Sequence, residues 1–230
     1  MLYKLKLLSI FLLTGITVFA QDQYLTAKSE DLEKTYESKS GYDVKEFPQK
    51  FRKDKPKNII LLIGDGMGVS QVFAGLTANK GRLFLENCKY IGFSKTQSAD
   101  NYITDSAAGG TALATGVKTY NGAIGVGVDG TPVKTILEEA SENGLATGLV
   151  STSSITHATP ASFIAHQAKR SSYEDIAADF LKTDIDVFIG GGLDHFAKRK
   201  DGRDLTDELK KKGYKVETEL KKIEKVKKGK

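Results

Sequence analysis

The stretch IILLIGDGMG, residues 59–68, decides the fold class of this 230-residue chain. It opens with five consecutive aliphatic residues, Ile59 to Ile63. An uninterrupted apolar run of this length predicts a strand that is buried on both faces of a sheet. Glycines then end the strand in a turn, and helical spacing follows from Val69 to Ala78. We therefore expect a strand–turn–helix unit with Asp65 at the carboxyl end of the strand.

The same alternation of strand and helix patterns continues along the chain. The predicted elements are helices over 131–142, 172–182 and from Asp204 or Thr206 to Lys212, and strands over 146–151 and 186–189. Strands that alternate with helices of about ten residues indicate βαβ units. The predicted fold is therefore α/β, with a mostly parallel central sheet flanked by helices on both faces. Ligands of such sheets bind at the carboxyl ends of the strands.

The first twenty residues have the plan of a secretory signal peptide. Two lysines precede an apolar run that ends at Phe19, and the small side chains of Val18 and Ala20 suit a cleavage site. A membrane anchor is the alternative, but the run is short for a spanning helix and no polybasic stop follows it. We therefore expect export to the periplasm or the outside and no stable membrane span. An oxidising compartment would leave Cys88 as a lone, buried thiol.

The formal net charge of +5 arises at the two ends of the chain. Residues 210–230 carry ten Lys and three Glu, whereas residues 21–209 carry 22 basic and 26 acidic side chains. The body of the protein is therefore mildly acidic, and a lysine-rich end is usually a solvated surface. We expect no nucleic-acid partner.

Asp65 stands between glycines at the end of the first predicted strand. A carboxylate in that position is costly unless a metal ion or another cation pairs with it. The alternative is that Asp65 caps the helix that starts near Val69. A dinucleotide-binding fingerprint fails here, because its third glycine would fall at Val69. The same spacing recurs at Gly125, Gly127 and Gly130, where no clear strand precedes it, and we expect a loop.

The segment ITDSAAGGTALATG, residues 103–116, predicts a helix with Ser106 at its N-terminus. Backbone N–H groups and the helix dipole favour anions such as phosphate at this point. A serine becomes a nucleophile only when a base or a metal activates it. No histidine lies within ten residues of Ser106, so a metal is the expected activator. The alternative is that Ser106 simply caps the helix.

The third segment, HATPASFIAHQAKR, covers residues 157–170. His157 and Thr159 follow a predicted strand, before a helix begun by Pro160, and both are possible metal ligands. Arg170 is placed at the far end of that helix, and a guanidinium group can clamp two phosphate oxygens. Each of these side chains, taken alone, also fits a structural role, as we expect for His166 and His195.

Together these three segments resemble the first three active-site motifs of alkaline phosphatase, a metal-dependent phosphomonoesterase. The resemblance covers roughly residues 57–220 and rests on GDGMG, TDSAAGGTALATG and HATPASFIAH followed by Arg170. It implies hydrolysis of phosphate monoesters through a phosphoserine intermediate, with zinc and magnesium as cofactors. It also allows a homodimer for a full-length protein, because the family is often dimeric.

The resemblance assigns a role to each matching residue. Asp65 would bridge zinc and magnesium, and Ser106 would be the nucleophile and a zinc ligand. Thr159 would bind magnesium, and Arg170 would clamp the phosphoryl oxygens. His157 occupies a position at the third metal site, where family members have either Asp or His.

The family draws its remaining metal ligands from a later part of the chain. This sequence has three histidines, none of them after His195, and a catalytic zinc ion needs about three protein ligands. We do not expect the Asp194–His195 pair to bind metal, since it matches a non-ligand turn. The chain therefore supplies only the first part of the site.

The expected domain organisation has three parts. Residues 1–20 form the signal peptide, residues 21–56 an N-terminal arm or linker, and residues 57–230 a partial alkaline phosphatase-like domain, as in a fragment or a truncated product. Two alternatives stay open. The chain is a non-catalytic remnant that binds metal or phosphate, or it is a related sulfatase or phosphodiesterase of the same superfamily.

Overall fold

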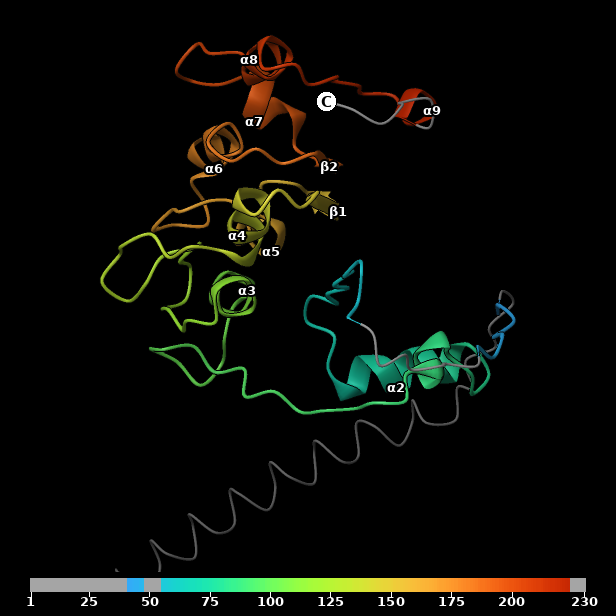
Figure 1. Ribbon diagram of the computed structural model, residues 1–230. Coiled ribbons are helices and arrows are strands. Elements are labelled where there is room, and N and C mark those ends of the chain that lie inside the picture. Colours follow the sequence, from blue (N-terminus) through green and yellow to red (C-terminus); the bar gives the residue numbers. More distant parts are fainter. Residues whose placement is uncertain (1–40, 48–54, 224–230) are drawn as a thin grey trace, which may run out of the picture. The chain divides into compact units, whose positions relative to one another are not determined.

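The computed structural model of the chain describes residues 41–47 and 55–223 (Figure 1). The expected signal peptide over 1–20 and most of the expected arm over 21–56 lie outside these residues. Among the helices that are described, none is long and apolar enough to cross a membrane.

The described residues divide into two units. The first unit consists of the residues up to Leu61 together with Met67–Ile91. It contains the helix α2 (Val69–Ala78), which has the bounds predicted from its apolar spacing, and the short 3-10 helix η1 (Phe84–Asn87).

Residues 41–47 of the expected arm pack within this first unit. The ring of Tyr42 stacks on that of Phe84 with centroids 5.4 Å apart, and the Tyr42 N–H donates to Asn79 Oδ1 at 2.8 Å. The Phe47 N–H donates to Asn87 Oδ1 at 2.8 Å. Two asparagine side chains therefore fix this part of the arm through its backbone.

Two predictions for the region around the first unit are wrong. Residues 59–63 form no strand and their side chains are exposed, because an aliphatic run becomes a strand only when a neighbour pairs with its backbone. No described residue makes a backbone hydrogen bond to this run. Cys88 is exposed rather than buried, since it ends η1 at the surface of the unit.

The second unit consists of Leu62–Gly66 and the chain from Gly92 onwards. Its elements are α3 (Ser106–Thr115), α4 (Ile136–Glu142), β1 (Gly148–Ser154), α5 (Ala158–Ala161), α6 (Tyr173–Asp179), β2 (Val187–Gly191), α7 (Leu193–Ala197), α8 (Leu205–Lys211) and α9 (Leu220–Ile223). The two strands pair in parallel, with Leu149 opposite Phe188. Figure 1 shows α4, α5 and α6 beside this pair. The α/β class with a parallel sheet flanked by helices is confirmed, as a partial domain.

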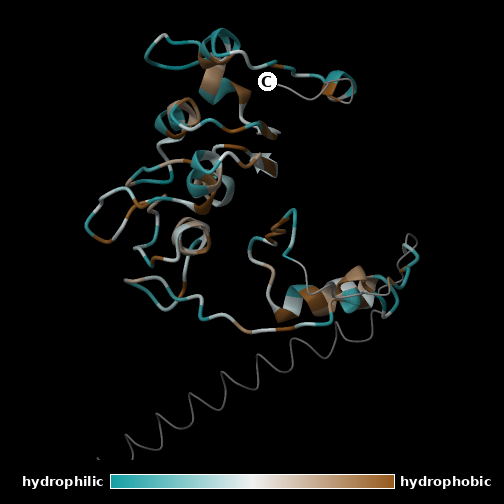
Figure 2. Cartoon of the chain, viewed as in Figure 1, coloured by the Kyte–Doolittle hydropathy of each residue, from teal (hydrophilic) through white to brown (hydrophobic). Residues whose placement is uncertain are grey.

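The hydrophobic core of the second unit lies where the strands meet the helices. Phe180 is 0% exposed, and its ring centroid lies 4.9 Å from that of Phe188 and 5.8 Å from that of Phe196. Because side chains alternate along a strand, Val150 and Val187 point to the opposite face, where they are 74% and 48% exposed. Figure 2 shows that α6 and α8 carry both hydrophobic and hydrophilic residues, as helices on the surface of a core do.

The helix predicted over 131–142 begins later than expected. Pro132 pairs with Val126 in an isolated antiparallel bridge, so this part of the chain is extended. Thr135 then caps α4, because its Oγ1 accepts from the Glu138 N–H while Glu138 Oε2 accepts from the Thr135 N–H. This capping box sets the first helical residue at Ile136.

The three glycines 190–192 are divided between β2 and the turn that follows it. Gly190 and Gly191 belong to β2, and a Cβ on Gly190 would lie 2.9 Å from the Ile155 Cβ. Only Gly192 leaves the strand, with φ at +91°, and α7 follows directly. Residues 213–219 form neither helix nor strand.

Phe180→Ala should lower the free energy of unfolding by about 3–5 kcal/mol, because it leaves a cavity in the aromatic centre of the core. The same change at Phe93, which is 99% exposed, should have no measurable effect. Urea unfolding followed by circular dichroism measures both values. Equal losses for the two variants would show that Phe180 does not anchor the core.

Candidate active site

The helix α3 is capped by Asp105 and not by Ser106. Asp105 Oδ1 accepts a hydrogen bond from the Ala108 N–H at 2.9 Å, and Asp105 has the extended backbone of an N-cap residue. The alternative that Ser106 caps its own helix is therefore wrong. Ser106 is the first helical residue and is partly buried, and its hydroxyl makes no hydrogen bond to another described residue. Since Asp caps helices as well as Ser does, the serine hydroxyl is left available.

The second carboxylate oxygen of Asp105 holds two other segments. Asp105 Oδ2 accepts from the Gly122 N–H and from Arg170 Nη1, each at 3.0 Å. The Asp105 N–H in turn donates to Asn121 Oδ1 at 2.9 Å. Asp105 was not among the predicted site residues, although an Asp directly before a helix of small residues is a recognisable cap signal.

These contacts change the acidity of Asp105. Burial raises its pKa, but the hydrogen bonds from the Ala108 N–H, from Arg170 and from the Gly122 N–H outweigh burial, and the arginine charge adds to them. The pKa of Asp105 is therefore held below its ordinary value of 3.8. The carboxylate stays charged opposite Arg170 at neutral pH.

Arg170 lies between Asp105 and His157. Its Nη2 donates to His157 Nε2 at 3.3 Å, and its backbone N–H donates to Gly122 O at 2.8 Å. His157 is the N-cap residue of α5, which begins at Ala158 and not at Pro160 as predicted. The four-residue α5 ends well before Arg170, so the prediction that Arg170 ends this helix is also wrong.

Asp65 and Thr159, which lie 94 positions apart in the sequence, are in direct contact. Thr159 Oγ1 donates to Asp65 Oδ2 at 2.9 Å. Asp65 does not cap α2, because Gly68 occupies that N-cap position. The structure thus brings two of the predicted metal ligands together. Within the described residues, no hydrogen bond joins either of them to the Ser106 hydroxyl.

The other two histidines are in structural contacts, as expected. His195 Nδ1 lies 2.7 Å from Thr156 Oγ1, and its ring stacks on Tyr173 at 4.8 Å. Asp194 pairs with Lys198 at 3.1 Å.

His166 bridges a loop and a helix. Its ring lies between Gly125 O and the Glu138 carboxylate. The glycines at 125, 127 and 130 form a loop, which confirms that prediction.

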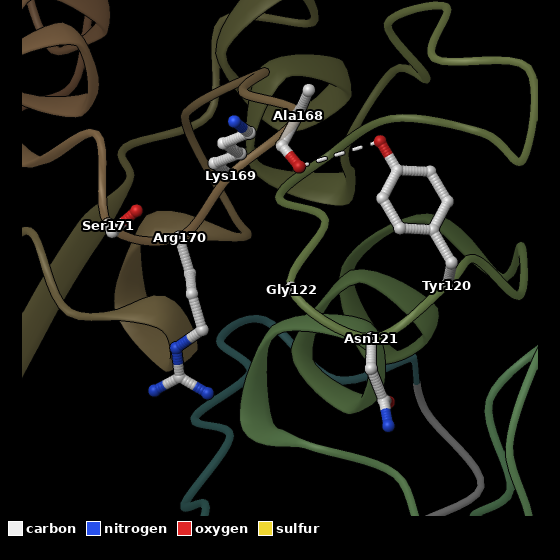
Figure 3. A pocket seen from close by; sticks show the side chains of 7 residues that line it. All are labelled: Tyr120, Asn121, Gly122, Ala168, Lys169, Arg170 and Ser171. Atoms are coloured by element: carbon white, nitrogen blue, oxygen red, sulfur yellow. Dashed lines mark hydrogen bonds between the residues drawn. The ribbon is translucent and has the colours of Figure 1, made fainter.

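An open hollow of about 440 Å³ adjoins Arg170. The residues that line it are Tyr120, Asn121, Gly122, Ala168, Lys169, Arg170 and Ser171. Figure 3 shows the Arg170 and Asn121 side chains extending in the same direction, with Lys169 directed away from them. The Tyr120 hydroxyl donates to Ala168 O at 3.5 Å across the hollow. Open space therefore lies next to the residue predicted to bind phosphate.

The predicted metal-binding groups of the site suit magnesium better than zinc. Asp65 and Thr159 supply two adjacent oxygen atoms, which suit a hard cation such as magnesium. In the described part of the chain, no three His, Cys, Asp or Glu side chains gather into a group that could hold a metal. A zinc ion, which needs about three such ligands, does not fit these residues alone.

Comparisons with known proteins give one consistent answer. A family model described as alkaline phosphatase matches residues 56–230. The chain is 47% identical over 173 residues to alkaline phosphatase 4 of Bacillus subtilis, which covers 69% of this chain and 37% of that protein. It is 38% identical over 199 residues to alkaline phosphatase of Escherichia coli, which covers 71% of this chain and 42% of that protein. The chain thus spans less than half the length of these curated relatives.

Solved structures agree with the sequence matches. Alkaline phosphatase from the Antarctic bacterium TAB5 superposes with a TM-score of 0.70 at 48% identity, over 72% of this chain and 49% of that chain. A variant of the TAB5 enzyme, with a histidine replaced by aspartate, has Mg bound in its M3 site. It superposes with a TM-score of 0.69 at 46% identity, over 75% of this chain and 51% of that chain.

Asp105→Asn should keep the helix cap but lose the charge opposite Arg170, and cost about 1 kcal/mol at neutral pH. Because the folded pKa lies below 3.8, this contribution is present above that pH and is lost as the pH falls through the folded pKa. The stability gap between wild type and variant should therefore shrink between about pH 5 and about pH 2. Urea unfolding at both pH values measures it.

Arg170→Met serves as the matched control for that experiment. It removes the other partner of the ion pair, so the loss in the double variant should be smaller than the sum of the two single losses. The ion pair between Asp105 and Arg170 would be contradicted if the two losses of stability were fully additive. It would also be contradicted if the difference in stability between wild type and Asp105→Asn did not change with pH.

Proposed function

Because the chain belongs to the alkaline phosphatase family, we propose that the protein hydrolyses phosphate monoesters through a phosphoserine intermediate on Ser106. The observation that carries the proposal is that Asp105, and not Ser106, makes the structural hydrogen bonds at the start of α3. Asp105 caps the helix and anchors Arg170, which leaves the adjacent Ser106 hydroxyl available for reaction.

The environment of Ser106 suits a phosphoryl group. The hydroxyl stands at the N-terminus of a ten-residue helix, where unpaired backbone N–H groups and the helix dipole favour an anion. In the proposed reaction the Ser106 oxygen attacks phosphorus and the bond to the alcohol oxygen breaks, so that the alcohol leaves with a proton. Water then attacks the phosphoserine, releases inorganic phosphate and returns a proton to Ser106.

Arg170 is the proposed clamp for the phosphoryl oxygens. Asp105 holds one of its two terminal nitrogens, and each terminal nitrogen has a hydrogen available for substrate. A planar fork held from behind in this way is pre-organised, and it stabilises the charge that spreads over the equatorial oxygens in the transition state. The open hollow beside Arg170 leaves room for the rest of the ester.

Zinc and magnesium are the proposed cofactors, with Asp65, Ser106, His157 and Thr159 as the ligands that this chain contributes. Bound divalent metal ions activate the serine hydroxyl and stabilise the charge on the leaving oxygen. Asp65 and Thr159 would hold magnesium, and their mutual contact and the magnesium bound to a TAB5 variant support this assignment. Zinc requires ligands in addition to those that are described. We also propose export, from the pattern of residues 1–20.

A second candidate function is binding of metal or phosphate without turnover. It is favoured by the small number of ligands, because the described residues contain no three-residue metal group. The two functions differ in one observable. Purified 230-residue chain that holds metal but shows no phosphoserine by mass spectrometry would favour binding alone, whereas turnover by this chain would exclude it.

Ser106→Ala in the full-length protein should lower kcat for a chromogenic phosphate monoester at alkaline pH by at least about 10³-fold, because the nucleophile is gone. Ser172→Ala is the matched control and should keep full activity, since Ser172 makes no side-chain cap bond at the start of α6. Absence of activity in the full-length wild type, supplied with zinc and magnesium, would disprove the proposed function.

Asp65→Asn should weaken binding of Mg²⁺ to the chain by at least about tenfold, because it removes the charged ligand of the proposed pair. Thr159→Ser keeps a hydroxyl oxygen and should retain binding close to the wild-type level. Isothermal titration with magnesium chloride measures both. Equal affinity in wild type and Asp65→Asn would mean that this pair does not hold the ion.

A further inference from the structure

The imidazole ring of His166 lies between two hydrogen-bond acceptors. Its Nδ1 is 2.6 Å from Gly125 O and its Nε2 is 2.9 Å from Glu138 Oε1. The side chains of His166 and Glu138 are each 17% exposed. Each ring nitrogen therefore lies within hydrogen-bonding distance of an oxygen, so the ring is held at both ends. Burial raises the pKa of Glu138, but hydrogen bonds from His166 and Thr135 outweigh it and keep that pKa below its usual 4.5.

Both acceptors are themselves held in place. Glu138 Oε2 accepts from the Thr135 N–H at 2.8 Å, and Thr135 Oγ1 donates to Phe163 O at 2.7 Å. Gly125 has φ at +56°, and a Cβ there would lie 2.1 Å from Ala165 O. Only glycine permits this approach, so the loop carbonyl meets the histidine ring at a fixed point.

The fixed ring lies next to a short ladder of backbone hydrogen bonds. Ile124 and Gln167 exchange two N–H···O bonds, each of 2.9 Å. Three residues further on, the Arg170 N–H donates to Gly122 O at 2.8 Å. The His166 ring therefore lies beside the backbone bonds that join the segments 122–125 and 166–170.

This ladder ends at the anchor of the proposed active site. The Gly122 N–H and Arg170 Nη1 both donate to the same oxygen, Asp105 Oδ2. At the other end of the loop, the Gly125 N–H donates to Thr111 Oγ1 of α3 at 2.9 Å. Both ends of the loop are thus bound to the helix that begins with Ser106.

We propose that His166 is a positioning residue for Arg170. Its ring clamps the segment 122–125 to the segment 166–170 and so keeps the guanidinium against Asp105, beside Ser106. The value of this position for catalysis rests on the proposed function, in which Arg170 binds the phosphoryl group.

The charged groups that face His166 explain why its loss should act locally. Glu138 faces the ring from α4, and Asp179 faces the backbone from α6, where its Oδ2 accepts from the His166 N–H at 2.9 Å. The same oxygen accepts from Gln167 Nε2 at 2.8 Å, and Lys182 Nζ lies 2.6 Å from Asp179 Oδ1. These contacts of Asp179 do not use the imidazole ring, so a His166 variant should keep its fold while the clamp is lost.

Amide hydrogen exchange in the 230-residue chain tests the clamp independently of activity. In His166→Ala, the amides of Gln167 and Arg170 should exchange at least about tenfold faster than in wild type, relative to the amide of Ile155. The Ile155 N–H bonds to Gly191 O and reports on the sheet. An unchanged ratio between Arg170 and Ile155 would overturn the clamp.

Two further variants separate positioning from general stability. Glu138→Gln should keep the wild-type ratio of exchange rates, because Gln preserves the capping box and its side-chain amide can still hydrogen-bond to His166 Nε2. Asp204 caps α8, because its Oδ1 accepts from the Thr206 N–H at 2.9 Å. Asp204→Ala removes this cap and should lower the stability of the fold without changing the ratio of the Arg170 and Ile155 exchange rates. A change of the ratio in Asp204→Ala would show that exchange at Arg170 follows stability alone.

Affinity for inorganic phosphate in the full-length protein tests the link to catalysis. His166→Ala should weaken phosphate inhibition about tenfold and Glu138→Gln should not, because the former displaces the clamp and the latter keeps it. If the Arg170 amide exchanges faster in His166→Ala while the affinity for phosphate stays unchanged, the positioning role is overturned. Activity that persists in Ser106→Ala would instead disprove the proposed function, and the exchange ratio would still report on the clamp.

Discussion

The carboxylate of Asp105 joins three separate segments of the chain, and the arrangement of the candidate site depends on it. One oxygen caps α3, and the other accepts from the glycine loop and from Arg170. An Asn at this position would cap the helix but present only one acceptor oxygen, and a Glu would be too long for the cap. The requirement for two charged oxygens close to the backbone therefore selects Asp, and it leaves the hydroxyl of Ser106 free of structural bonds.

Elements with a strong local pattern could be predicted from the sequence. The helix α2 was predicted over its observed range, because its apolar spacing and its flanking glycines are local signals. The run over 59–63 failed for the opposite reason, since a strand depends on a partner that the run itself does not specify. The late start of α4 could not be predicted for the same reason. It depends on the bridge between Val126 and Pro132, and the sequence around Pro132 does not specify that partner.

The sequence predicted the residues of the candidate site better than the contacts between them. Resemblance pointed to Asp65 and Thr159, and the structure places them in contact. The sequence did carry the signal of Asp105 as the helix cap, but not its pairing with Arg170, which joins residues 65 positions apart. The link from His166 to Arg170 was also out of reach, since it runs through backbone bonds that carry no sequence signal.

The small residues of α3 explain how these parts come so close together. Two adjacent glycines in a helix cost about 1 kcal/mol each relative to alanine, so local stability argues against them. Packing argues for them: a Cβ on Gly110 would lie 2.9 Å from Ser162 Oγ and 3.5 Å from the Thr159 Cα. The absence of a side chain at Gly110 lets the α5 region approach the helix that carries Ser106. The small residues of α3 therefore lower its helix propensity, but they allow the close approach of α5. This approach brings the proposed magnesium ligand Thr159 near the helix that carries the proposed nucleophile.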